Sequence, residues 1–235
     1  MTHFTDAPRL PVIDLAPFEI GNPWREHVAA QIDWAAAEFG IFRIVNHGIE
    51  PGLSDCLVKL SRRLLARERT AGERAAFAAL GDFAEQLGFR DVVRDYVAGV
   101  TGLAHRLMTS VARGLHLGDP YFMDRLTGNA SLEFRLAAGP TGARPNEPTL
   151  LSLLDHDAST GLEVRHRGRI IEVPHLPGAL ICAVGESLEH LAASRYRVAS
   201  YRLTGQAGND FLNDSLALSF HFGAEHSSVE HARAA

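Results

Sequence analysis

The spacing of hydrophobic residues divides the chain into a first half with helical patterns and a second half with strand patterns. Apolar side chains fall on one helical face over residues 23–39, 53–64 and 89–115, which predicts amphipathic helices. Short apolar runs at 10–15 and 41–45 predict strands. The first half should therefore run strand, helix, strand, helix, followed by a long helix of the kind that covers a sheet.

Turn-forming residues mark the ends of the predicted helices. Asn22 can cap the first helix, Pro23 suits its first turn and Gly40 can end it. Asn46–Gly48 predicts a turn into the second helix, so we interpret the histidine within it as structural. Residues 67–88 have few large apolar side chains, and we expect a surface helix and loop there.

The second half consists of short apolar segments separated by Gly, Pro and Asp. The expected strands are 132–138, 149–154, 161–166, 169–173, 178–184, 196–204 and 215–222. Their regular spacing is typical of a sandwich or barrel. Because helices come first and strands later, the sequence predicts an α+β fold in which a jelly-roll core packs against N-terminal and central helices. We expect one domain over residues 1–235, mostly helical to about 125, with the jelly roll at about 130–222 and a tail at 223–235.

Composition and charge narrow the classes of partner. With 235 residues, 46% hydrophobic and 22% charged, the chain has an ordinary globular composition. A net charge of −5 and scattered arginines disfavour a nucleic-acid partner. No leader and no long apolar run is evident, so we expect a cytoplasmic protein without a membrane partner. A small-molecule substrate fits best, and a homodimer stays open. Cys56 and Cys182 are expected to be buried free thiols.

Two parts of the sequence are similar to one enzyme family. Leu10–Leu15 and Phe39–Ile49 resemble the N-terminal region of plant and microbial iron(II)/2-oxoglutarate-dependent oxygenases of the isopenicillin N synthase type. Leu150–Asp157, Gly161–Val164 and Val173–Leu180 resemble the catalytic jelly roll of the same family in order and spacing. The resemblance spans most of the chain and implies a double-stranded β-helix core.

The same resemblance implies that the metal site has changed. Family members hold iron(II) with a His-x-Asp pair and a distal His, which leaves open positions for co-substrate and oxygen. The matching positions here are Pro145, Glu147 and Tyr201. Proline has no donor and a neutral phenol is a weak ligand. The resemblance therefore predicts no bound metal and no cofactor.

Two further family motifs are replaced in the same way. The Arg-x-Ser pair that grips 2-oxoglutarate falls on Ser215 and Ala217, and an Asn and a Tyr of a third motif fall on Ala137 and Gly139. We therefore expect that the chain has lost the family's reaction.

The vacated pocket is the candidate site. Strand alternation should place small side chains on its inward faces, and the predicted substrate-binding residues are Arg135, Ala137, Gly139, Ser215, Ala217 and Ser219. Glu147 and Tyr201 are predicted to act as an acid/base pair, with His221 as a third catalytic candidate. The alternative is that Tyr201 only satisfies a buried carboxylate and that His221 is a packed residue.

Other histidines carry weaker signals. Asp155–Asp157 suggests a metal cluster, but we interpret it as a solvated turn. His226 and His231 belong to the expected tail.

Three functions fit these expectations. We favour a metal-independent, non-oxidative enzyme that cyclises, isomerises or dehydrates a bulky metabolite, with natural-product biosynthesis implied by the resemblance alone. A non-catalytic binding or partner protein derived from an oxygenase would explain the same replacements. An oxygenase with a relocated iron site, using Glu147 with His221 or another histidine, is the third alternative.

Overall fold

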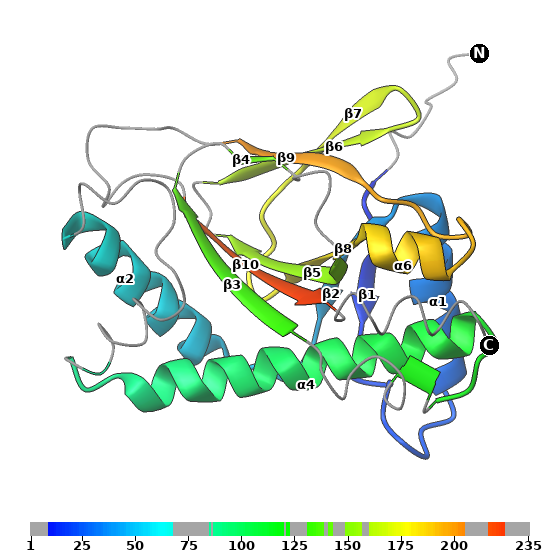
Figure 1. Cartoon of the computed structure of the whole chain (residues 1–235), viewed down its shortest axis with the longest axis horizontal. Coiled ribbons are helices and arrows are strands. Elements are labelled where there is room, and N and C mark those ends of the chain that lie inside the picture. The colour runs from blue at the N-terminus through cyan, green and yellow to red at the C-terminus, as the bar shows by residue number, and fades with distance from the viewer. Residues whose placement is uncertain are drawn as a thin grey trace, which may run out of the picture.

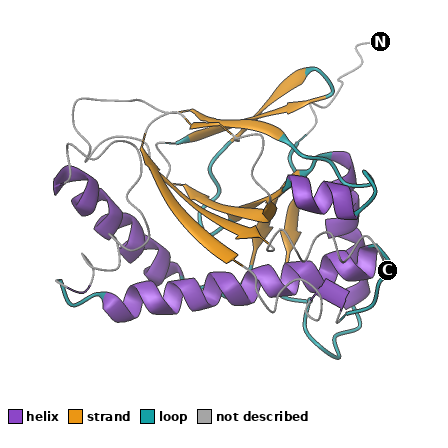
Figure 2. Cartoon of the chain, viewed as in Figure 1, coloured by secondary structure: helices purple, strands orange, loops and turns teal. Residues whose placement is uncertain are grey.

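The structure is a computed structural model. It describes residues 9–67, 85, 87–119, 121–122, 131–138, 141–142, 149–156, 160–204 and 216–223. Within these ranges the elements form three layers, with a large sheet between a layer of helices and a smaller sheet (Figures 1 and 2). The space between the two sheets is the interior of a jelly roll.

The larger sheet has six strands among the described residues, in the order β1-β2-β8-β5-β10-β3. Their bounds are β1 Val12–Asp14, β2 Ile41–Val45, β3 Ser131–Ala138, β5 Thr149–His156, β8 Leu180–Val184 and β10 Leu216–Gly223. Strands β1 and β2 pair in parallel, and every other neighbouring pair in this sheet is antiparallel.

The smaller sheet has four strands among the described residues, in the order β4-β9-β6-β7, and all its pairs are antiparallel. The strands are β4 Thr141–Gly142, β6 Gly161–His166, β7 Arg169–Val173 and β9 Ser200–Thr204. A two-residue turn with positive φ at Arg167 (49°) and Gly168 (78°) joins β6 to β7, the backbone that tight hairpins favour.

The helices are α1 Arg25–Glu38, α2 Pro51–Arg67, α4 Arg90–Gly114 and α6 Glu186–Leu191. The long helix α4 runs across the outer face of the larger sheet, as its apolar spacing predicted (Figure 1). No helix in the described ranges combines the length and apolar character needed to cross a bilayer, and the predicted location in the cell stays a prediction.

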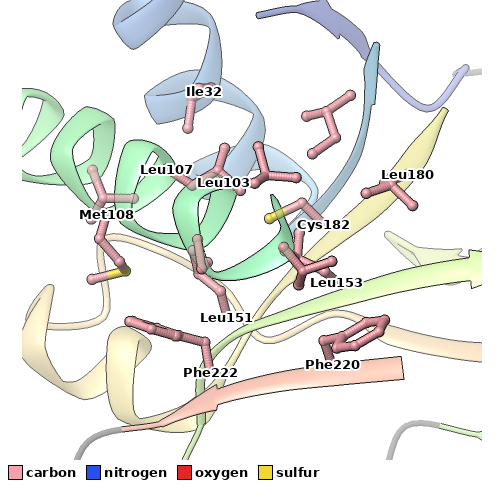
Figure 3. Close-up of a cluster of buried hydrophobic side chains, with 14 of the residues drawn as sticks. Ile32, Leu103, Leu107, Met108, Leu151, Leu153, Leu180, Cys182, Phe220 and Phe222 are labelled. Carbon is pink, nitrogen blue, oxygen red and sulfur yellow. The ribbon is translucent and has the colours of Figure 1, made fainter. Parts of the chain in front are cut away.

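Alternate residues of the larger sheet belong to two different apolar clusters. One cluster lies on the helix side, where Leu103 and Leu107 of α4 pack with Leu151, Leu153 and residues of β10 (Figure 3). The second cluster lies between the sheets, and its members include Leu154, Ile181, Ala183, Leu162, Val164 and Leu203. Because successive strand residues point to opposite faces, β2, β8 and β5 contribute to both clusters, whereas the buried apolar residues of β10 belong to the helix-side cluster alone.

The predicted α+β class and jelly-roll core are confirmed, with several local corrections. Asn22 does not cap α1: its side-chain oxygen accepts a hydrogen bond from the Trp24 N–H at 2.9 Å, and the helix begins at Arg25. Helix α6 and strand β4 were not predicted, and β9 begins at Ser200 rather than at 196.

Other predictions fall outside the described residues or stay untested. Most of 67–88 and the tail from 224 onward are not described, and the division into domains stays a prediction. Both cysteines are free, with Cys182 buried and Cys56 half-buried.

Candidate functional site

A row of polar side chains interrupts the apolar surface between the sheets. On β10, Phe220 and Phe222 pack on the helix side, so Ser219 and His221 face the space between the sheets. Ser152 of β5 stands directly opposite His221 in the strand register. We call Ser152, Ser219 and His221 the serine–histidine row.

The row is joined by hydrogen bonds through the imidazole. Nδ1 of His221 lies 2.9 Å from the Ser152 Oγ, and Nε2 lies 3.1 Å from the Ser219 Oγ. A neutral imidazole donates from one nitrogen and accepts at the other, and a hydroxyl can do either. The row can therefore hold a proton at either end, which is what an acid or base requires.

Burial distinguishes the row from an ordinary surface pair. Ser152 is only 7% exposed, while Ser219 and His221 are half-buried. Its neighbours across the strands, Ala183 and Leu154, belong to the apolar cluster between the sheets. Polar groups in such surroundings need partners, and the hydrogen bonds within the row supply them.

Tyr201 lies on the smaller sheet, on the face that this sheet turns toward the larger one. It lies on β9 opposite Val164, is half-buried, and packs against the apolar cluster between the sheets. The structure therefore places Tyr201 and His221 on the two walls of one interior. Their catalytic roles stay predictions.

Several predicted site residues cannot be placed. Gly139, Pro145, Glu147 and Ser215 lie outside the described residues. The predicted substrate-binding positions on strands keep a defined backbone register: Arg135 of β3 stands opposite Ser219, and Ala137 stands opposite Ala217.

The prediction of a solvated turn at Asp155–Asp157 is wrong at Asp155 and His156, and Asp157 lies outside the described residues. Strand β5 continues through His156, which is 7% exposed and whose ring centroid lies 5.2 Å from that of His175 at 68°. The alternation of more and less buried residues in β5 continues to His156, two residues beyond the predicted end of the strand at 154. The sequence prediction missed this continuation.

Asp155 anchors the helix side of the same strand. Its carboxylate accepts hydrogen bonds from the Ser54 hydroxyl and, at 3.1 Å, from the Tyr96 hydroxyl. Burial first, and then the Asp155 carboxylate, raise the pKa of Tyr96 well above its ordinary value. This cluster ties β5 to α2 and α4, and it faces away from the space between the sheets.

Of the three positions predicted for the iron(II) ligands, the structure describes only Tyr201. The described residues contain no group of three or more His, Cys, Asp or Glu side chains that could hold a metal ion. At the position predicted for the distal histidine, Tyr201 packs against the apolar cluster between the sheets, and a neutral phenol is a poor donor for iron(II). Whether the other ligands are replaced stays a prediction, because Pro145 and Glu147 are not described.

Comparison with known proteins gives consistent matches. A family model described as the N-terminal region of non-haem dioxygenase in morphine synthesis matches residues 10–71. A probable iron/ascorbate oxidoreductase of Dictyostelium discoideum is 22% identical over 94% of this chain and 84% of its own length. Gibberellin 20 oxidase 5 of Arabidopsis thaliana is 25% identical over 82% of this chain and 63% of its own length, so the chain spans less than two thirds of that relative.

Solved structures share the fold. The rice dioxygenase for auxin oxidation superposes with a TM-score of 0.72 at 21% identity, covering 93% of this chain and 84% of that one.

The relatives contradict the predicted metal-independent cyclase, isomerase or lyase and its non-catalytic alternative, because they are named as oxidoreductases and dioxygenases. The prediction failed because it took the predicted replacement of the metal ligands as decisive for the reaction class. The chain is therefore similar in sequence to non-haem dioxygenases and related oxidoreductases, and it shares the jelly-roll fold of solved 2-oxoglutarate/iron(II)-dependent oxygenases.

Proposed function

We propose that the chain is an oxidoreductase of the oxygenase type that acts on a small organic molecule bound between the two sheets. The observation that carries the proposal is the serine–histidine row, a hydrogen-bonded polar group that adjoins apolar residues on the inner surface. The names of the relatives support the class of reaction.

The apolar residues and the polar residues of the inner surface would bind different parts of the substrate. Apolar residues such as Leu154 and Ile181 would contact the carbon skeleton of the substrate, since desolvation of apolar area favours binding. His221 would bind a polar group of the substrate and hold or accept a proton there, with Ser152 fixing the orientation of the ring.

The test is a co-substrate assay on the full chain. Protein purified without chelators is analysed for metal, then incubated with iron(II), ascorbate, dioxygen and 2-oxoglutarate while succinate and oxygen uptake are measured. The proposal predicts 2-oxoglutarate-dependent formation of succinate. Absence of both metal binding and succinate formation would overturn it.

Matched variants connect the activity to the site. His221→Ala should lower turnover by about a hundredfold or more, the ordinary loss when a general acid or base is removed. His27→Gln changes an exposed histidine of α1 and should leave turnover unchanged. Equal activities of the two variants would remove His221 from the mechanism.

A further inference from the structure

A cavity opens on the outside of the molecule, between the end of α1 and the β6–β7 hairpin. Its volume is about 460 Å³, and it is lined by Trp34, Glu38, Phe39, His166, Arg167 and Arg169. This volume lies within the ordinary range for small-molecule sites. No member of the serine–histidine row lines it, so this α1–hairpin cavity is separate from the proposed active site.

Aromatic rings form two walls of the cavity. Phe39 stacks on His166 with ring centroids 4.5 Å apart and an interplanar angle of 25°. Trp34 meets Phe39 edge-on at 5.6 Å and 73°. The Trp34 side chain remains 55% exposed, although burying an aromatic ring is strongly favourable. The two rings therefore form a corner against which a planar ring can pack.

The charges of the cavity do not cancel. The Glu38 carboxylate lies 2.6 Å from Nη2 of Arg167 and 3.2 Å from Nε2 of His166, so Arg167 balances its charge. Arg169 is exposed, and within the described part of the chain no hydrogen bond or ion pair engages its guanidinium. The cavity is left with one uncompensated positive charge beside its aromatic corner.

The hairpin fixes the position of this charge. Arg169 stands opposite His166 in the register of β6 and β7, and the intervening turn has only two residues, both with positive φ. Since His166 is itself held by Phe39 and Glu38, the backbone that carries Arg169 is attached to the aromatic wall.

We propose that the α1–hairpin cavity binds a planar aromatic anion. The ring of the ligand packs into the corner of Trp34 and Phe39, and its carboxylate or sulfonate pairs with Arg169. A guanidinium presents paired donors that match a carboxylate in geometry. A neutral aromatic molecule forfeits this pairing, and a cationic one is repelled by Arg169.

The test measures binding of 2-naphthoate to the full chain by isothermal titration calorimetry, with 2-naphthalenemethanol as a neutral ligand of the same ring. Arg169→Gln should weaken naphthoate binding by about tenfold, the effect of losing one charge-assisted contact, and leave the alcohol unchanged. Trp34→Ala should weaken both ligands by about tenfold, because both lose the ring contact.

Controls separate the cavity from the rest of the surface. Arg165→Gln changes an exposed arginine of the same hairpin that does not line the cavity, and Trp24→Ala changes another exposed tryptophan. Both should retain the affinity of the unchanged protein. The proposal is overturned if naphthoate does not bind at millimolar concentration, or if Arg169→Gln and Arg165→Gln bind it equally. Loss of binding in His221→Ala would also overturn it, since the ligand would then sit between the sheets.

Discussion

Replacing Gly40 with alanine should destabilise the fold far more than the same change at another glycine of similar backbone conformation. Gly40 lies between α1 and β2 with a φ of +69°, where a side chain costs about 1–2 kcal/mol. A Cβ there would also lie 2.1 Å from the backbone carbonyl oxygen of Arg197, against 3.4–4 Å for an ordinary contact. The two backbone segments would have to separate by more than 1 Å, the difference between these distances.

Neither segment is free to move. The Gly40 carbonyl accepts a hydrogen bond from the Val184 N–H at 2.8 Å, beside the pairing of β2 with β8. On the other side, the Arg197 N–H donates to the Ala36 carbonyl at 3.2 Å, and the Tyr196 hydroxyl donates to Asp33 at 2.9 Å. Separation of the segments therefore breaks hydrogen bonds in a buried region, which adds to the cost of the overlap.

Gly21 provides the matched control. It has a φ of +85°, and a Cβ there would meet nothing within 4 Å, so Gly21→Ala should cost only the backbone term of about 1–2 kcal/mol. Gly40→Ala should cost about 3–5 kcal/mol, with overpacking added. Urea unfolding followed by circular dichroism measures the loss of unfolding free energy in both variants. If Gly40→Ala fails to fold while Gly21→Ala folds, the prediction that Gly40→Ala costs more is also met. Equal losses would refute the reasoning.

Three further predictions concern side chains that are wholly or partly buried: a histidine, a tyrosine and a cysteine. Burial lowers the pKa of His47, whose Nδ1 accepts a hydrogen bond from the Ile49 N–H at 3.2 Å. The stability from this neutral imidazole is complete above the unfolded pKa of about 6.5 and is lost as the pH falls below it. His47→Gln should therefore flatten the fall of melting temperature on acidification, and an unchanged slope would exclude His47 as its source. Tyr96→Phe removes the hydroxyl that donates to Asp155 at 3.1 Å and should cost about 1–2 kcal/mol in urea unfolding; no loss would mean that the bond contributes nothing. Burial raises the pKa of Cys182, so Ellman's reagent should modify it only on unfolding, and rapid modification of both thiols would contradict the structure.

The elements that were predictable from the sequence are those with a long apolar pattern. The 25 residues of α4 carry one buried stripe over their whole length, and β10 alternates Leu218 and Phe220 on one face with Ser219 and His221 on the other. In both cases the hydrophobic period alone identifies the element and the face that it buries.

The elements that were missed depend on contacts distant in sequence. Tyr196 was assigned to a strand, but its hydroxyl binds Asp33 of α1, and the segment before β9 packs on that helix instead. Helix α6 has only six residues, too few for a periodic signal. Ser152 was not selected as a site residue, because a single serine within an apolar strand has no signal until the strand opposite brings His221 against it.

The two faces of β5 separate stability from chemistry. Leu151, Leu153 and Asp155 face the helices and join β5 to α2 and α4, so changes there should unfold the protein before they affect a reaction. Ser152 faces the other way. A valine there would bury more apolar area, and an isolated polar group in such surroundings is a cost unless it is paired. The hydrogen bond with His221 offsets that cost. Because Ser152 takes no part in the contacts of β5 with the helices, the proposed activity and the fold can be tested with separate substitutions on the same strand.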